Sequence, residues 1–215
     1  MKPAILLLNF FLLISVARAQ SITDSKQVIL DSPALNFKSI STNLPFFNSS
    51  SDAEKILTSI MDALGLDANF KIKTAKVPNV EATIRHHERY ILYNPDFVNK
   101  VNAATKDKWA SIFILAHEVG HHLEGHTLAD AAGSPAIELE ADQFAGFTLC
   151  KMGATLDEAQ LAMHYIANTE ASKTHPGRAD RLLAIEKGWD KASVQTKGLA
   201  YHPNTLPSQN GVSQN

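Results

Sequence analysis

The chain has a single cysteine, Cys150, among 215 residues. One cysteine cannot form a disulfide within the chain, and it cannot supply the several thiolates of a Cys-based zinc site. Any metal ion must therefore be held by His, Asp or Glu side chains. Cys150 lies among apolar residues near the end of an expected helix, and we interpret it as a buried thiol.

The chain also has no large excess of charge of either sign. The formal net charge is −2, and no long run of basic residues occurs, which argues against a nucleic-acid partner. With 45% hydrophobic and 20% charged residues, the composition is that of an ordinary globular protein. The length gives room for one folded domain and little else.

Long apolar runs are absent except at the beginning of the chain. Lys2 precedes an apolar run from Ala4 to Val16, and a small-x-small triplet ends at Ala19. This pattern predicts a signal peptide over 1–19, cleaved after Ala19. The alternative is an uncleaved anchor, but the run is short for a span of about 20 residues. We therefore expect an exported mature chain, periplasmic or extracellular, without stable membrane insertion.

Three further segments follow the expected signal peptide. Residues 20–51 are predicted to be an extended arm or linker that could also lie across a cleft as a latency segment. Residues 52–201 are expected to form the domain, and the polar residues 202–215 a disordered tail. The alternation of apolar and polar residues predicts strands at 69–76, 80–84 and 88–93. Helices are expected at 52–64, 96–103, 106–124, 135–152 and 155–168, with a last one opened by 174–176 and continuing to 189.

These elements predict an α+β fold that is mainly α, with a small sheet of about three strands before the longest helices. The strand at 88–93 is interpreted as an exposed edge strand that could pair with an extended peptide. The alternative is that Tyr90, Ile91 and Leu92 only build the sheet. The turn before this strand contains His86 and His87, which are expected to be solvated.

The most informative stretch is Trp109–Thr127, which contains His117, Glu118 and His121 in the order H-E-x-x-H. On a helix, positions i and i+4 lie on one face, so His117 and His121 can bind one zinc ion. Glu118 lies about 100° further round the helix. There its carboxylate can take a proton from a zinc-bound water. The motif is short, so its significance depends on a third ligand and a cleft.

Three acidic residues further along supply a candidate third ligand: Glu138, Glu140 and Asp142. Glu138 and Asp142 share a helix face, whereas Glu140 lies about 200° from Glu138 and points away. We therefore expect Glu138 to bind the zinc ion and Asp142 to accept a hydrogen bond from a ligating imidazole. The alternative is that all three acids form a solvated helix face.

Three motifs in this order, HEVGHH, ELEADQFAGF and THPGRADRL, resemble the zinc metallopeptidases, or gluzincins, that include the CAAX prenyl protease, HtpX and the Oma-type mitochondrial protease. The resemblance covers about residues 84–189 and indicates a soluble exported branch. It implies a zincin-like single domain in which an E-x-x-x-D helix supplies the third ligand, here Glu138 with Asp142. It also matches His175 and Arg181 to a later H-P-x-x-x-x-R motif.

The expected reaction is peptide-bond hydrolysis, with Glu118 as general base. His175 is the expected stabiliser of the oxyanion, with His164 and Tyr165 as weaker candidates. Arg181 is expected to pair with a carboxylate near the site.

Two further histidines near the motif are not expected to be ligands. His122 points about 100° away from His121. His126 lies beyond Gly125, where a surface position or a contact with a ligand is favoured over coordination.

The leading hypothesis is an exported zinc-dependent endopeptidase, holding one zinc ion per chain, that acts on peptides or unfolded proteins. Two alternatives remain open: a non-catalytic, zinc-stabilised peptide-binding protein, and a zinc hydrolase for a non-peptide amide. The presence of Glu118 argues against the first alternative, because a structural zinc site needs no general base. The sequence does not separate the second, because the chemistry at the metal is shared.

Overall fold

The structure is a computed structural model in which residues 44–128 and 134–200 are described. The expected signal peptide, residues 20–43 of the expected arm and the expected tail lie outside the described residues. Within the described ranges, no helix combines the length and the apolar character that a membrane crossing requires.

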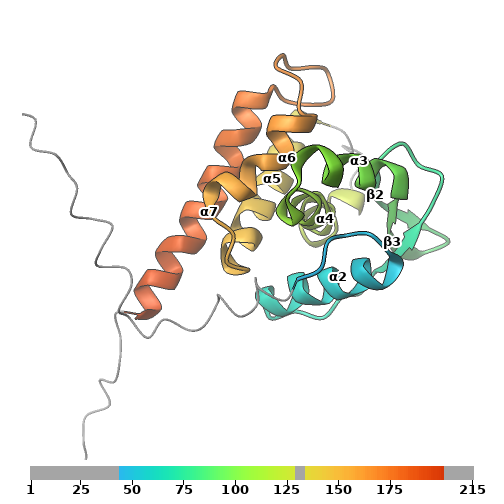
Figure 1. Ribbon diagram of the computed structural model, residues 1–215, viewed down its shortest axis with the longest axis horizontal. Helices are drawn as coiled ribbons and strands as arrows, with labels where there is room; N and C mark the ends of the chain where they lie inside the picture. Colours follow the sequence, from blue (N-terminus) through green and yellow to red (C-terminus); the bar gives the residue numbers. More distant parts are fainter. Residues whose placement is uncertain (1–43, 129–133, 201–215) are drawn as a thin grey trace, which may run out of the picture. The chain divides into compact units, whose positions relative to one another are not determined.

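The described residues form a mainly helical domain with a small three-stranded sheet, which confirms the predicted mainly α type of α+β fold (Figure 1). The elements are α2 (Ser50–Leu64), β1 (Lys71–Thr74), β2 (Val80–Arg85), β3 (Glu88–Tyr93), α3 (Pro95–Thr105), α4 (Lys108–Leu123), the 3₁₀ helix η1 (His126–Leu128), α5 (Pro135–Lys151), α6 (Leu156–Ile166) and α7 (Arg178–Ala200).

The sheet has the strand order β1-β3-β2, with β3 parallel to β1 and antiparallel to β2. His86 and His87 join β2 to β3 with φ of 52° and 63°, and two left-handed residues in succession give the turn whose twist suits a hairpin. The interpretation of 88–93 as an edge strand is wrong, because β3 is hydrogen-bonded on both sides. Within residues 44–128 and 134–200, β2 has no strand partner on its other side, and this free edge lies beside the H-E-x-x-H helix.

Helix α4 lies at the centre of the described residues and packs against α3, α5, α6 and β2 (Figure 1). Its first turn is capped by Asp107, whose side chain accepts the Trp109 N–H at 2.8 Å. Almost every side chain of α4 is buried. Because neighbours surround the helix, the side chains that it carries are held on a fixed support. Gly125, with φ of 79°, follows its last turn.

Glycines allow two close helix contacts around the site. A Cβ on Gly120 of α4 would lie 3.0 Å from the Phe144 ring of α5, which accounts for a glycine inside the central helix. A Cβ on Gly188 of α7 would lie 1.8 Å from the carbonyl oxygen of Gln143 on α5. The backbones of α5 and α7 therefore touch, and this contact brings side chains of α7 onto the helix that contains Glu138.

The ends of the later helices follow the sequence signals in two cases and depart from them in a third. Ser134 caps α5, and Thr155 forms the expected capping box of α6. The last helix begins at Arg178 rather than at 174–176. The Arg178 guanidinium donates twice to the Ala167 carbonyl, at 2.9 and 2.7 Å. The backbone N–H of Arg178 donates to the Asn168 carbonyl at 2.9 Å. These bonds hold 167–177 as a loop.

Candidate metal centre

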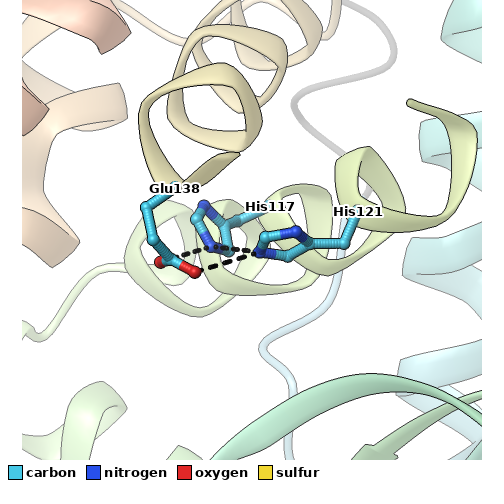
Figure 2. A group of neighbouring side chains, drawn as sticks. All are labelled: His117, His121 and Glu138. Carbon is cyan, nitrogen blue, oxygen red and sulfur yellow. Dashed lines mark hydrogen bonds and ion pairs between the residues drawn. The ribbon is translucent and has the colours of Figure 1, made fainter. Parts of the chain in front are cut away.

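Helices α4 and α5 bring His117, His121 and Glu138 together, with the two imidazoles on one face of α4 (Figure 2). Nε2 of His117 lies 3.1 Å from Nε2 of His121 and 3.5 Å from Oε2 of Glu138. Nε2 of His121 lies 3.6 Å from Oε1 of Glu138. The two imidazole nitrogens therefore face the Glu138 carboxylate, each nearest to a different one of its oxygens, and we call these three side chains the donor triangle.

This triangle fits a zinc ion. A tetrahedral zinc ion with ligands at 2.0–2.1 Å keeps its ligand atoms about 3.3 Å apart. The nitrogen–nitrogen separation of 3.1 Å and the nitrogen–oxygen separations of 3.5 Å to Oε2 and 3.6 Å to Oε1 lie close to that value. One ligand atom from each residue lies within 4.8 Å of the other two. Two imidazoles and one carboxylate also form a donor set found in catalytic zinc sites, which leave the fourth position open.

His117 is backed by a buried ion pair between α5 and α7. Its Nδ1 lies 3.0 Å from Oδ1 of Asp142, and although the ring is not aligned for a straight hydrogen bond, Nδ1 has no other partner. Asp142 is fully buried and accepts from Nε and Nη2 of Arg181, at 2.6 and 2.7 Å. Nη2 of Arg181 also lies 3.6 Å from Oε2 of Glu138. Arg181 thus touches two carboxylates of the site at once.

Glu118 lies on the wall of the same cleft, facing the free edge of the sheet. The side chain is buried, and its Oε2 accepts the backbone N–H of Ala82 on β2 at 2.7 Å. Burial raises the pKa of Glu118 to about 7, although the positive charge of His117 and the Ala82 N–H oppose the rise. A carboxyl with a pKa near neutrality can both accept and release a proton.

The metal-free cluster holds a proton on one imidazole. Burial acts to lower the pKa of His117, but the nearby carboxylates of Asp142 and Glu138 outweigh burial and raise it to about 10. Burial and the neighbouring charge of His117 lower the pKa of His121 to about 3. Burial opposes ionisation of Glu138, but His117, His121 and Arg181 lower its pKa to about 2. In the protonated His117, Nε2–H faces Glu138 and His121, where a metal ion would lie.

His175 reaches the site from the loop that precedes α7. Its Nε2 lies 4.0 Å from Oε2 of Glu138, and the side chain is 59% exposed. Its Nδ1 lies 2.8 Å from Oγ1 of Thr174. If the threonine hydroxyl donates to Nδ1, Nε2 carries the proton and can donate to a ligand. The weaker candidates His164 and Tyr165 are exposed and do not line the cleft.

The cleft has a volume of about 300 Å³ and collects side chains from most elements of the domain. It includes the donor triangle, Glu118, His175 and several apolar side chains. Its lining residues are Asn79, Val80, Glu81, Ala82, Phe97, Phe113, Ile114, His117, Glu118, His121, His126, Thr127, Ile137, Glu138, Met163, Ile166, His175 and Arg181.

Sequence reasoning missed two groups that touch the expected functional side chains. His126 is buried and contacts His121, whereas the sequence did not decide between a surface position and a contact with a ligand. Its position directly after the helix-ending Gly125 was the only signal. The N–H of Ala82 left no signal, because a backbone group is the same at every position. His122, which is also buried, binds the carbonyl of Tyr90 on β3 instead of the cluster.

Comparison of the chain with protein-family models, with curated proteins and with solved structures found no match. Function is therefore inferred from the geometry and chemistry of the site.

Proposed function

We propose that the protein is a zinc-dependent endopeptidase with a zincin-like domain, exported by its N-terminal signal peptide and acting on peptides or unfolded proteins. The observation that carries the proposal is the triangle of His117, His121 and Glu138, with Glu118 on the wall of the same cleft. The motif resemblance to the CAAX prenyl protease, HtpX and Oma-type peptidases agrees with this set of residues.

The ligands and the base have distinct roles in this proposal. Zinc held by His117, His121 and Glu138 would polarise the substrate carbonyl and make a water molecule more acidic. Glu118 accepts the proton of that water at its carboxylate and passes it to the leaving amine. Its raised pKa, about 7, suits both steps near neutral pH.

The remaining site residues hold charge and orientation. His175 donates from Nε2 to the oxygen that gains negative charge as the carbonyl is attacked. Asp142 accepts from Nδ1 of His117, so that Nε2 keeps its lone pair for the metal. Arg181 fixes Asp142 and balances the negative charge of Glu138.

The free edge of β2 is the proposed binding surface for the substrate backbone. Ala82 donates its N–H to Glu118, so the backbone groups of this residue face away from β3. Because this direction alternates along an antiparallel strand, the backbone groups of Val80 and Ile84 also face the free edge. An extended peptide can pair with such an edge beside the metal centre.

The decisive experiment replaces the base and leaves the ligands in place. Glu118→Gln should keep about one zinc ion per chain and lose peptide hydrolysis by at least about a hundredfold, because general-base catalysis contributes that much. Glu186→Gln, at an exposed position of α7, is the matched control and should behave as wild type. Zinc is quantified by elemental analysis, and turnover is measured with unfolded-protein and peptide-library substrates. Equal rates for Glu118→Gln and wild type would contradict the mechanism.

A second pair of variants tests the third ligand. Glu138→Ala should remove zinc far more completely than Glu140→Ala, because only Glu138 reaches the triangle of donor atoms. Zinc content after equilibration with a chelator gives the comparison. Equal loss, or the reverse order, would assign the third ligand to another residue.

A further inference from the structure

The imidazole of His121 has a partner on the side away from the donor triangle. Nδ1 of His121 lies 3.0 Å from Nδ1 of His126, and Nε2 of His126 lies 3.0 Å from Oε2 of Glu140. The His121 and His126 rings meet edge to face, with centroids 5.2 Å apart. A line of contacts therefore runs from the donor triangle through two imidazoles to a carboxylate at the surface.

The directions of the hydrogen bonds in this line follow from the chemistry of its two ends. A His121 that binds a metal ion through Nε2 carries its proton on Nδ1 and must donate it. Nδ1 of His126 must then accept, so His126 carries its own proton on Nε2. An ionised Glu140 can only accept, and it receives that proton. One arrangement of protons satisfies every contact.

The end of α4 explains how His126 reaches this position. Gly125 adopts a left-handed conformation after the last turn, and η1 folds back, closed by a 3.0 Å bond from the Leu128 N–H to the Gly125 carbonyl. This return buries His126, whose side chain is 8% exposed, whereas Glu140 is 64% exposed. The helical phase that turns Glu140 away from the triangle directs it to His126 instead.

We propose that His126 is a positioning residue that sets the orientation and proton arrangement of His121 for metal binding, with Glu140 fixing His126 in turn. The inference rests on the proposed metal site and adds residues that the H-E-x-x-H motif does not include. A partner on the second nitrogen of a metal-binding histidine fixes the ring and strengthens it as a ligand, and its loss typically costs about 10–100-fold in metal affinity.

The test compares two substitutions at one position. His126→Leu fills much of the space but offers no acceptor, whereas His126→Asn places an amide oxygen near the position of Nδ1. Zinc affinity, measured by chelator competition, should fall about 10–100-fold in His126→Leu and recover in part in His126→Asn. The visible absorption bands of bound Co²⁺ should change in His126→Leu, because they report ligand geometry. His164→Leu, at an exposed position of α6, is the control.

Glu140→Ala provides a readout that does not depend on filling a buried space. Its zinc affinity should fall a few-fold relative to Glu186→Ala, because both residues are exposed and only Glu140 contacts His126. The inference is overturned if His126→Leu and His126→Asn bind zinc equally well, or if Glu140→Ala matches its control. Absence of zinc binding by the wild-type chain would instead overturn the proposed function.

Discussion

The two histidines of the donor triangle are held from opposite sides by different kinds of support. His117 is backed by Asp142 and Arg181, which are almost completely buried and fully charged. His121 is backed by His126, and the line ends at an exposed carboxylate. A buried bidentate ion pair cannot lose one partner without leaving a charge in the interior. An exposed pair is worth about 0–1 kcal/mol. The fold therefore supports His117 through buried charges and His121 through a contact that ends at the surface.

The largest effect is expected on the His117 side. Arg181→Leu should destabilise the metal-free fold by up to about 3–5 kcal/mol, because it removes both hydrogen bonds from Arg181 and leaves the buried Asp142 with only the His117 imidazole beside it. Urea denaturation measures the loss, and Lys187→Leu, at an exposed position of the same helix, should change stability by less than about 0.5 kcal/mol. The double variant Asp142→Leu/Arg181→Leu should recover part of the loss. A single variant as stable as wild type would show that the buried charges do not support this side.

The contact between α5 and α7 tests the same side from a distance. Gly188→Ala places a Cβ 1.8 Å from the Gln143 carbonyl, next to Asp142, and must push the helices apart. We expect a loss of at least about 1–3 kcal/mol, as in other overpacked interiors, together with weaker zinc binding. Gly120→Ala is the informative comparison, since its Cβ meets only the Phe144 side chain at 3.0 Å and alanine favours helix by about 1 kcal/mol. A milder effect of Gly188→Ala than of Gly120→Ala would contradict the packing argument.

The proton of the cluster should also reside on the His117 side. Because the pKa of His117 is raised to about 10 and that of His121 is lowered to about 3, zinc must displace about one proton from His117 near pH 8. Apparent zinc affinity should then rise about tenfold per pH unit between about pH 7.5 and 9. Calorimetry in buffers of different ionisation enthalpy counts the released proton.

The same proton also makes the stability of the metal-free protein depend on pH. A raised histidine pKa stabilises the fold below the usual histidine value of about 6.5, and this contribution is lost as the pH rises toward 10. Asp142→Asn should reduce proton release at pH 8, because the nearby Asp142 carboxylate is the leading effect that raises the pKa of His117. Release of no proton by wild type would place the proton elsewhere.

The smallest effect is expected on the exposed side and should depend on salt. The Debye length falls from roughly 14 Å at 0.05 M salt to about 3 Å at 1 M. The few-fold loss of zinc affinity in Glu140→Ala should therefore shrink in 1 M salt, whereas the reduced proton release in Asp142→Asn should persist, because Asp142 is fully buried. Chelator competition at each salt concentration measures the first effect, and calorimetry measures the second. Equal sensitivity of the two variants would remove the distinction between the sides.

Local signals carried much of the fold prediction. Ser134 and the Thr155 capping box mark helix starts through bonds to nearby backbone groups, so the sequence contains both partners. The order of strands depends on contacts between distant segments. For this reason the sequence analysis predicted an edge strand at 88–93, whereas β3 lies at the centre of the sheet. The start of α7 was placed too early because Arg178 binds carbonyl groups of residues 167 and 168, which no local pattern reveals.

The candidate site divides in the same way. Helical phase separates Glu138 and Asp142 from Glu140, and Glu138 is the acid whose carboxylate lies within 4.8 Å of the ligand atoms of His117 and His121. The partner of His121 required knowledge of how the chain turns after Gly125. The partner of Glu118 is a backbone N–H of a strand that lies 36 positions earlier in the chain. Spacing identifies groups on one helix, whereas groups contributed by turns and strand edges need the folded chain.

The hydrogen bond between Ala82 and Glu118 has a consequence for the alignment of substrates. A peptide that pairs with β2 finds the N–H groups of Val80 and Ile84 facing the free edge, about 14 Å apart along the strand, while the N–H between them is held by the base. The peptide must either leave that position unpaired or displace the carboxylate toward the metal centre. In both cases the position opposite Ala82 differs from the neighbouring positions along the peptide, whatever the side chains of the peptide. The hydrogen-bonding register of the peptide on β2 would then determine which peptide bond lies beside Glu118.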